Sequence, residues 1–242
     1  MLTITNLSKT YPGGKLAVDN LSLEVEGGHI CGFIGHNGAG KSTTLKSAAG
    51  VLSFDEGDIV IDGHSIRREP VAAKRVTAFL PDNPDLYEFL TGIKYLEFIA
   101  DIYELPRSDR KPLIDKYASA FELGGSLGSP ISGYSHGMKQ KLALISALIR
   151  RPKLLILDEP FVGLDPKASY LLKEFLHELC AEGGAVFFST HVLEVAEKLC
   201  DMIAIIKQGR LIEAGKTSDI VGKSSLESVF LELAEEAVHD EA

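Results

Sequence analysis

Two alternations of apolar and polar residues open the chain, and both predict half-buried strands. The first covers residues 2–8 and the second residues 17–25. A period of two places every second side chain on the same face of a sheet. We expect these two strands to be antiparallel, since an antiparallel sheet can keep one face in solvent. Further short strands are expected at residues 57–63, 76–80, 185–190, 201–206 and 210–214.

Two unbroken apolar runs predict central strands that are covered on both faces. Residues 30–34 read Ile-Cys-Gly-Phe-Ile, and residues 154–157 read Leu-Leu-Ile-Leu. Such runs are typical of parallel strands whose faces both carry helices. Helical segments are expected at residues 168–181 and 192–199. The chain is therefore expected to be an α/β protein with a mixed sheet and an N-terminal antiparallel β-subdomain.

Between about residues 83 and 152 the apolar spacing changes to that of helices. Apolar residues recur every three or four positions around Leu96, Tyr117 and Ile145, and prolines and glycines separate the three sets. Because strands precede and follow this interval, we expect an inserted α-helical subdomain. One domain would cover residues 1–222. A helical tail over residues 223–242 is indicated by a final apolar stripe, formed by Leu226, Val229, Phe230, Leu233 and Ala237.

Composition narrows the class of protein without identifying it. The 242 residues are 45% hydrophobic and 24% charged, which is ordinary for a soluble globular protein. A net charge of −9 argues against a nucleic-acid partner. No apolar run approaches the roughly 20 residues that span a bilayer, and the N-terminus carries no secretion signal. We expect a cytoplasmic protein that reaches a membrane only through a partner, with its three cysteines buried and reduced.

Residues 35–43, directly after the first central strand, carry a phosphate-binding pattern. They are Gly35, His36, Asn37, Gly38, Ala39, Gly40, Lys41, Ser42 and Thr43. The spacing G-x-x-x-x-G-K-S is that of a nucleotide-binding P-loop, in which glycines let backbone N–H groups approach phosphate oxygens. Lys41 would carry its charge to the β- and γ-phosphates, and the Ser42 hydroxyl would bind Mg²⁺. These residues predict a P-loop NTPase core.

The second central strand ends in two carboxylates, Asp158 and Glu159. The carboxyl ends of parallel strands form the usual ligand edge of an α/β sheet, so Asp158 is expected to hold Mg²⁺. We expect Glu159 to point to the opposite side of an extended chain, where it would orient a water for attack on the γ-phosphate. A purely structural acid pair is the alternative interpretation.

With these motifs in place, the chain resembles the ATP-binding subunits of ABC transporters over nearly its whole length. Tyr11 matches the aromatic residue that stacks on adenine, and residues 35–43 match the P-loop. The stretch from Tyr134 to Met138 lies where the family has its signature LSGGQ. Asp165 belongs to the loop after the acid pair, and His191 matches the switch histidine. As a lone residue, His191 would more often cap a helix, since residues 190 and 191 are expected to begin one.

The resemblance implies an ATPase with ATP and Mg²⁺ as ligands, and with Glu159 and His191 as catalytic residues. It also implies a second cassette as partner, because in this family Ser135 and Gly137 of one cassette close over the ATP of the other. The remaining partner would be an integral membrane permease, holding this subunit at the inner face of the membrane. Residues 83–103 are its expected docking surface, with core packing as the alternative.

The chain departs from the family pattern at two places that bear on the site. Asp82 stands where the family has a glutamine, and we expect it to keep the Mg²⁺ contact through a carboxylate oxygen. His136 replaces a signature glycine, and this version of the signature is similar to that of cassettes serving export-type permeases. Three interpretations stay open: a transporter motor, a non-transport soluble ABC ATPase, and a weakly hydrolysing regulatory cassette of a heterodimer.

Overall fold

The computed structural model describes residues 1–222 and 225–230, and its first sheet is built by the alternating segments. This sheet has the order β2-β1-β4-β5 and is antiparallel throughout, as predicted. Its strands are β1 (Leu2–Thr10), β2 (Leu16–Val25), β4 (Glu56–Ile61) and β5 (His64–Ser65). Leu2 pairs with Val25 on one side and with Ile61 on the other, so the apolar positions of three strands share one register.

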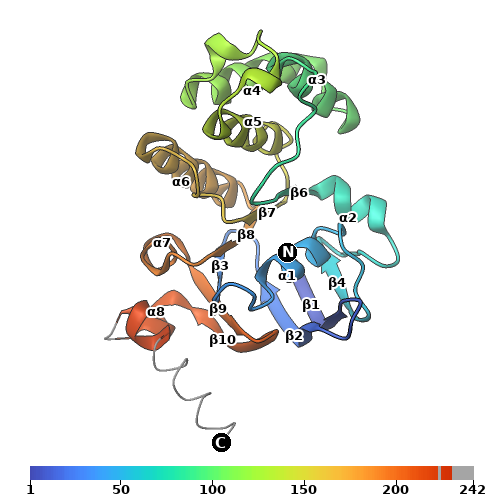
Figure 1. Cartoon of the computed structure of the whole chain (residues 1–242), viewed down its shortest axis with the longest axis vertical. Coiled ribbons are helices and arrows are strands. Elements are labelled where there is room, and N and C mark those ends of the chain that lie inside the picture. The colour runs from blue at the N-terminus through green and yellow to red at the C-terminus, as the bar shows by residue number, and fades with distance from the viewer. Residues whose placement is uncertain (223–224, 231–242) are drawn as a thin grey trace, which may run out of the picture.

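The second sheet has six strands in the order β10-β9-β3-β8-β7-β6 (Figure 1). They are β3 (Ile30–Ile34), β6 (Thr77–Leu80), β7 (Leu154–Asp158), β8 (Ala185–Thr190), β9 (Met202–Lys207) and β10 (Arg210–Lys216). The pairs from β6 to β9 are parallel, and β10 runs antiparallel to β9. This confirms the mixed sheet. Every residue of β3, β7 and β8 is buried, which explains their unbroken apolar sequences.

Alternate residues of the central strands serve two different cores. Leu155 and Leu157 of β7 pack with the helices on one face of the sheet. Leu154 and Ile156 pack on the other face, with helix α1 and the antiparallel sheet. The two sheets are therefore joined by one apolar layer, and the carboxyl ends of β3, β7 and β8 are held at one edge.

The named α-helices are α1 (Lys41–Ala48), α2 (Pro70–Val76), α3 (Gly92–Ile102), α4 (Arg107–Ala120), α5 (His136–Leu148), α6 (Pro166–Ala181), α7 (Leu193–Leu199) and α8 (Thr217–Val221). Helices α3, α4 and α5 lie between β6 and β7 in sequence and form a lobe away from the antiparallel sheet (Figure 1). They fall inside the interval 83–152 that the helical spacing indicated. Helix α2 was not anticipated, because it buries one residue, Ala73, and so has no apolar stripe.

Arg150 fastens this lobe to the core. Its Nη2 donates to the carbonyl oxygens of Thr77, at 2.5 Å, and Lys74, at 3.3 Å. The guanidinium also lies 3.2 Å from the centroid of the Tyr103 ring. Burial lowers the pKa of Arg150 to about 10, which shows how far the charge has been taken from water. The end of the lobe is thus held by a half-buried cation that donates to backbone carbonyls.

The predicted C-terminal tail falls only partly within the described residues. Residues 226–230 form a helical turn in which Leu226 is fully buried and Phe230 half-buried. The predicted positions Leu233 and Ala237 lie outside the described residues. Within the part of the chain that the structure describes, no helix is long and apolar enough to cross a membrane. The three cysteines are buried and unpaired.

Candidate functional site

The P-loop joins β3 to α1 and depends on glycine for its shape. Gly38 and Gly40 have φ of 83° and 109°, in the left-handed region that side chains disfavour. A Cβ on Gly40 would lie 2.5 Å from the carbonyl oxygen of Ala17, and one on Gly35 would lie 2.5 Å from that of Ile206. The inner end of the loop is therefore packed tightly against β2 and β9. Its amide groups lead directly into the N-terminus of α1, which favours an anion.

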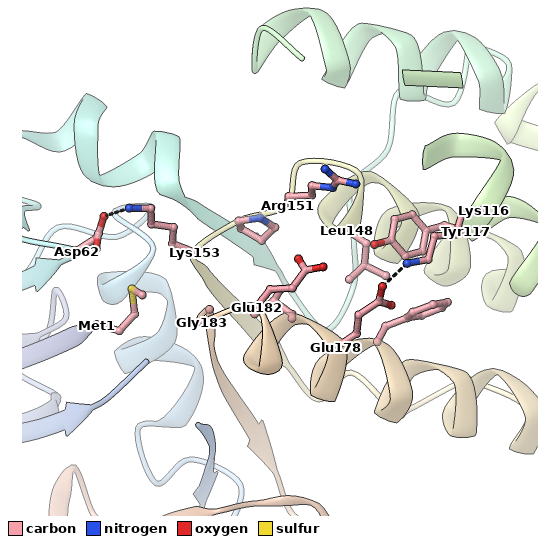
Figure 2. Close-up of a pocket in the computed structure, with 14 residues that line it drawn as sticks. Met1, Asp62, Lys116, Tyr117, Leu148, Arg151, Lys153, Glu178, Glu182 and Gly183 are labelled. Carbon is pink, nitrogen blue, oxygen red and sulfur yellow. Dashed lines mark hydrogen bonds and ion pairs between the residues drawn. The ribbon is translucent and has the colours of Figure 1, made fainter. Parts of the chain in front are cut away.

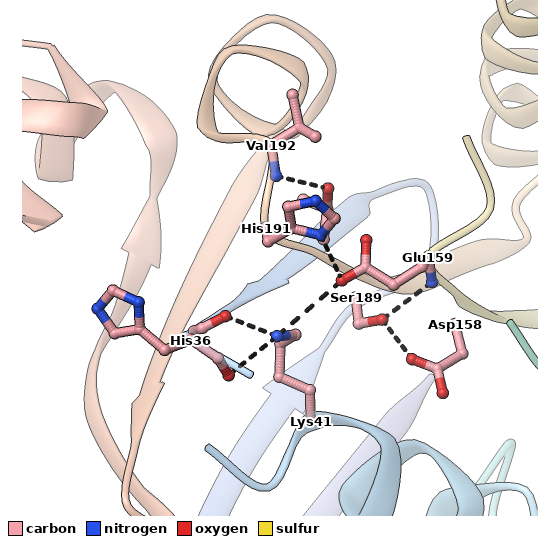
Figure 3. A network of polar contacts seen from close by, with 9 residues as sticks. His36, Lys41, Asp158, Glu159, Ser189, His191 and Val192 are labelled. Carbon is pink, nitrogen blue, oxygen red and sulfur yellow. Dashed lines mark hydrogen bonds and ion pairs between the residues drawn. The ribbon is translucent and has the colours of Figure 1, made fainter. Parts of the chain in front are cut away.

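Lys41 is a buried cation without a close anionic partner (Figure 3). Its Nζ donates to the carbonyl oxygens of Gly35, at 2.6 Å, and His36, at 3.2 Å. The carboxylate of Glu159 lies 4.0 Å away. Burial lowers the pKa of Lys41, against the opposing effects of Glu159 and Asp158. A polyphosphate would supply the counter-charge that this ammonium group lacks.

Asp158 and Ser189 meet at the carboxyl ends of β7 and β8, where they are register partners. The Ser189 hydroxyl donates to Asp158 Oδ1 at 2.6 Å and accepts the backbone N–H of Glu159 at 3.0 Å. The other oxygen, Asp158 Oδ2, is buried without a hydrogen-bond partner among the described residues. An orphaned carboxylate oxygen beside a P-loop fits a cation ligand, because a buried charge is costly unless it is paired.

Sequence reasoning missed Ser189. The signal was a polar residue at the end of an otherwise apolar strand, but its importance depends on β8 lying next to β7. That adjacency follows from the sheet topology rather than from a motif.

Glu159 leaves the strand in a way that the sequence did not indicate. Its φ is 50°, so the chain turns into the left-handed region immediately after β7 ends at Asp158. The expectation that Glu159 continues an extended chain is therefore wrong. The turn, fixed by the bond to Ser189, directs the carboxylate toward Lys41 and His191 (Figure 3). A non-glycine residue held at positive φ is a cost that structures usually concentrate at functional sites.

His191 is not a helix cap. Helix α7 begins at Leu193, two residues later, and Val192 N–H is bonded to the Thr190 hydroxyl. The His191 side chain is 55% exposed, and its Nδ1 lies 3.0 Å from Glu159 Oε1. Glu159 thus faces a histidine on one side and Lys41 on the other.

A pocket of about 260 Å³ lies over the P-loop. It is lined by Tyr11, Lys15, Ala17, His36, Asn37, Gly38, Gly40, Lys41, Ser42, Thr43, Asp82 and Glu159. The Tyr11 hydroxyl lies 3.2 Å from the Thr43 hydroxyl, and its ring remains partly exposed at the pocket rim. Asp82 accepts the N–H of Asn83 through Oδ1. Residues that are far apart in sequence, from Tyr11 to Glu159, therefore face one space.

The signature residues lie elsewhere. Ser135 caps α5 by accepting the N–H of Met138, and a Cβ on Gly137 would lie 3.3 Å from the Gly163 carbonyl oxygen. Asp165 caps α6 through Oδ1 and pairs with Lys141 through Oδ2, at 2.6 Å. Lys141 holds the pKa of the Asp165 carboxyl below its usual range. Neither the signature nor Asp165 lines the P-loop pocket, and a nucleotide contact by Asp165 stays a prediction.

A larger cavity, of about 350 Å³, lies at the seam between α4, α6 and the N-terminus (Figure 2). Its charges are largely internal pairs. Lys116 meets Glu178 at 2.5 Å, and Lys153 meets Asp62 at 2.6 Å. No P-loop residue lines it. The P-loop pocket differs, because Lys41 meets its nearest carboxylate, that of Glu159, only at 4.0 Å, and Asp158 Oδ2 is buried without a hydrogen-bond partner among the described residues.

The expected docking surface divides into buried and exposed residues. Leu86 is buried in the core, as the packing alternative requires. Tyr87 and Phe89 are 50% and 82% exposed, and Phe98 of α3 packs edge-on against Tyr87 at 5.5 Å. With Ile102, which is also exposed, these three aromatic residues make the lobe patch.

Comparison with known proteins agrees with this geometry. Residues 18–162 match the family model of the ABC transporter. The ABC-type transporter ATP-binding protein EcsA of Bacillus subtilis (strain 168) is 32% identical, covering 98% of this chain and 97% of its own. The linearmycin resistance ATP-binding protein LnrL of the same organism is 34% identical, covering 92% and 71%.

A solved ATP-binding subunit of an ABC transporter superposes with a TM-score of 0.92. It is 34% identical, and the match covers 97% of this chain and 99% of that one. Sequence and fold thus agree with the matched family over most of the chain. The chain belongs to the ABC transporter family, as an ATP-binding subunit of the kind that hydrolyses ATP.

Proposed function

We propose that this subunit binds MgATP in the P-loop pocket, pairs with a second cassette to hydrolyse it, and drives a separate membrane permease. One observation carries the proposal. Glu159, which lines the pocket, lies within 4.0 Å of both Lys41 and His191, and the preceding residue, Asp158, has a buried oxygen without a hydrogen-bond partner among the described residues. An acid, a buried cation and a free metal-ligand oxygen are the parts that phosphoryl transfer to water needs.

The residues present fit a magnesium ion. Ser42 would bind it from the start of α1, Asp158 would bind or orient it through Oδ2, and Asp82, which also lines the pocket, would supply a further carboxylate oxygen. When bound, Mg²⁺ neutralises charge on the β- and γ-phosphates. Ser189 fixes the Asp158 carboxylate by donating to Oδ1, so that the other oxygen keeps its direction.

Glu159 is placed to hold a water and accept its proton. Its Oε1 is shared between His191 and Lys41, which restrict the carboxylate to one orientation. His191 is 55% exposed and lies 3.0 Å from Glu159, so it would reach a γ-phosphate bound beside that carboxylate. The residues would act as a unit: Lys41 on the phosphate, Glu159 on the water, and His191 on both. Tyr11, at the rim, would stack on the adenine ring.

The position of the signature supports pairing of two cassettes. Ser135 and Gly137 belong to a unit formed by α5 and the loop at Gly163, and they do not face their own P-loop pocket. The pocket also stays open over the exposed residues 36–38. A second cassette, presenting its own Ser135 and Gly137, would close it. Loss of the γ-phosphate would then release the pair, giving a motion driven by differential affinity.

The lobe patch supports a permease partner at the inner face of a membrane. Exposed aromatic residues that touch one another on a helical lobe make a contiguous apolar surface, which typically marks an interface. Export is the direction we propose, because the signature variant is similar to export-type cassettes and LnrL is named for linearmycin resistance.

The first test is ATP hydrolysis by the purified chain, with two variants. Lys41→Ala should abolish the thermal stabilisation given by MgATP, because the phosphate cation is lost. Glu159→Gln should keep that stabilisation and lower kcat by more than about 100-fold, since it removes the base while keeping its shape. Tyr170→Ala, on an exposed face of α6, is the matched surface control and should change neither quantity. Equal loss of binding in both site variants would contradict the assigned roles.

A second candidate is a regulatory cassette that binds ATP and hydrolyses it slowly. It is favoured by Asp82, which adds negative charge at the pocket wall, and by His136, which adds bulk at the signature. This candidate would be supported if the wild type hydrolyses ATP slowly and the Asp82→Gln variant hydrolyses it faster. Co-purification separates both candidates from a non-transport soluble ATPase, because the motor should retain an integral membrane protein.

A further inference from the structure

We propose that Phe230 is a positioning residue for the P-loop and acts through the side chain of His36. The two ring centroids are 4.7 Å apart, with the ring planes at 56°. His36 is the second residue of the loop, and its carbonyl oxygen accepts a hydrogen bond from Lys41 Nζ. Phe230 therefore contacts His36, whose backbone carbonyl accepts a hydrogen bond from Lys41.

The outer part of the P-loop, residues 36–38, is the part whose shape a packing contact can stabilise. At the inner end, Ala39 is buried and Gly40 packs against the Ala17 carbonyl. At the outer end, residues 36–38 are exposed, and a Cβ on Gly38 would meet nothing within 4 Å. A loop segment with few packed neighbours and positive φ has a low cost of rearrangement. A ring packed on His36 restrains this outer segment in the shape that Lys41 requires.

The segment that carries Phe230 is itself anchored. Leu226 is fully buried, in the same core cluster as Ala196 and Leu199 of α7. Its backbone N–H donates to Glu197 Oε2 at 2.8 Å. Leu226 and Phe230 are four residues apart in one helical turn, so both face the protein. Phe230 is thereby held at a fixed position relative to α7.

The segment of residues 225–230 contacts two elements close to the site, helix α7 and the P-loop. Helix α7 begins two residues after His191. At one end the segment is bonded to α7, and at the other it packs on the P-loop. Glu159 lies near both of these parts of the chain: its Oε1 lies 3.0 Å from His191, two residues before α7, and 4.0 Å from Lys41, at the end of the P-loop. The segment of residues 225–230 thus connects α7, through Glu197, with the P-loop, through His36.

The expected consequence is preorganisation of nucleotide binding. Without the ring contact, the outer loop becomes ordered only when the nucleotide binds, and part of the binding free energy is used for this ordering. The affinity for ATP therefore falls, while the rate of the chemical step is unchanged. From the usual strength of an aromatic pair, the loss of affinity is roughly 2- to 10-fold. The kinetic part of this inference rests on the proposed function of the pocket as an ATPase site.

The test compares variants in the full chain. Phe230→Ala removes the ring, Phe230→Leu keeps apolar volume without the ring, and Phe230→Tyr keeps the ring. Glu227→Ala, exposed on the same turn, is the matched control. The measurements are KM and kcat for ATP, the Kd of a fluorescent ATP analogue, and amide hydrogen exchange of residues 35–40 without nucleotide. A His36→Ala, Phe230→Ala double variant completes a cycle.

Phe230→Ala and Phe230→Leu should raise KM and Kd by the same factor at unchanged kcat, and should speed exchange in the loop. Phe230→Tyr and Glu227→Ala should match the wild type, and Phe230→Ala should add nothing in the His36→Ala background. The inference is overturned if the ring-free variants lower Tm but leave KM, Kd and loop exchange unchanged, or if the two substitutions are additive. Failure of the wild type to bind ATP would contradict the proposed function, while the exchange measurement would still decide this inference.

Discussion

Substituting Ser189 by alanine should damage the site without touching any residue named by a motif. The hydroxyl donates to Asp158 Oδ1 at 2.6 Å and accepts Glu159 N–H at 3.0 Å, and it is fully buried. Its removal would leave a buried carboxylate without its donor and an unpaired N–H at a residue with positive φ. Each unsatisfied buried group costs about 1–3 kcal/mol, so with two such groups the free energy of unfolding should fall by about 2–6 kcal/mol.

The same change should slow catalysis. An Asp158 carboxylate that is free to rotate holds a cation poorly, and loss of the Ser189 bond releases Glu159 from its turn. Groups that orient metal ligands are commonly worth about 10- to 100-fold in activity, which is about 1.4–2.7 kcal/mol in the barrier. Urea unfolding would give the stability change, and steady-state hydrolysis across Mg²⁺ concentrations would give kcat and the Mg²⁺ requirement.

The chain offers a matched control for this substitution. Ser47 in α1 is also fully buried, but its hydroxyl has no hydrogen-bond partner within the described residues. Ser47→Ala removes the same atom without breaking a bond, so its unfolding free energy should change by less than about 1 kcal/mol, or rise. The reasoning is refuted if Ser189→Ala and Ser47→Ala have the same stability and the same hydrolysis rate.

Three further predictions concern separate parts of the molecule. Asp82→Ala should raise the Mg²⁺ concentration for half-maximal hydrolysis by about 10-fold, and Asp82→Gln should raise it less; unchanged Mg²⁺ dependence in both would exclude Asp82 as a ligand. Arg150→Met should lower the unfolding free energy by about 2–4 kcal/mol, because two carbonyl oxygens lose their charged donor, and a urea midpoint equal to wild type would contradict this. Burial raises the pKa of Cys180 from 9.0 to about 11, so stability should fall as pH rises through this window, where the unfolded thiol ionises first. Cys180→Ala should show a shallower fall in chemical unfolding across the same pH range.

The layout of the fold was predictable because its segments obey simple local rules. The first two strands alternate because one face of their sheet is buried, and Leu2 keeps the same register with both neighbours. Residues 154–157 read as one apolar run because alternate side chains enter two different cores. Helix α2 was not predicted because Ala73 is its one buried residue, so its sequence has no helical period of apolar residues.

The site residues that belong to a sequence motif could be predicted. Those whose role depends on which segments lie side by side in the fold could not. Lys41 and Asp158 were found because their residue types follow strands in a known spacing. Ser189 matters only because β8 pairs with β7, and Phe230 matters only because a distant segment returns to His36. The left-handed turn at Glu159 depends on a hydrogen bond from another strand, which no local pattern indicates.

The central claim, that the P-loop pocket is half of a site completed by a second cassette, is tested most directly by the mass of the Glu159→Gln protein in saturating MgATP. Light scattering after gel filtration should give two chains, and adding Ser135→Arg should return the mass to one chain while each chain still binds ATP. Ser108→Arg, exposed on α4, is the control for the added arginine and should leave the pair intact. A single-chain mass with ATP fully bound, or pairing that survives Ser135→Arg, would contradict closure of the pocket by the signature of a second copy.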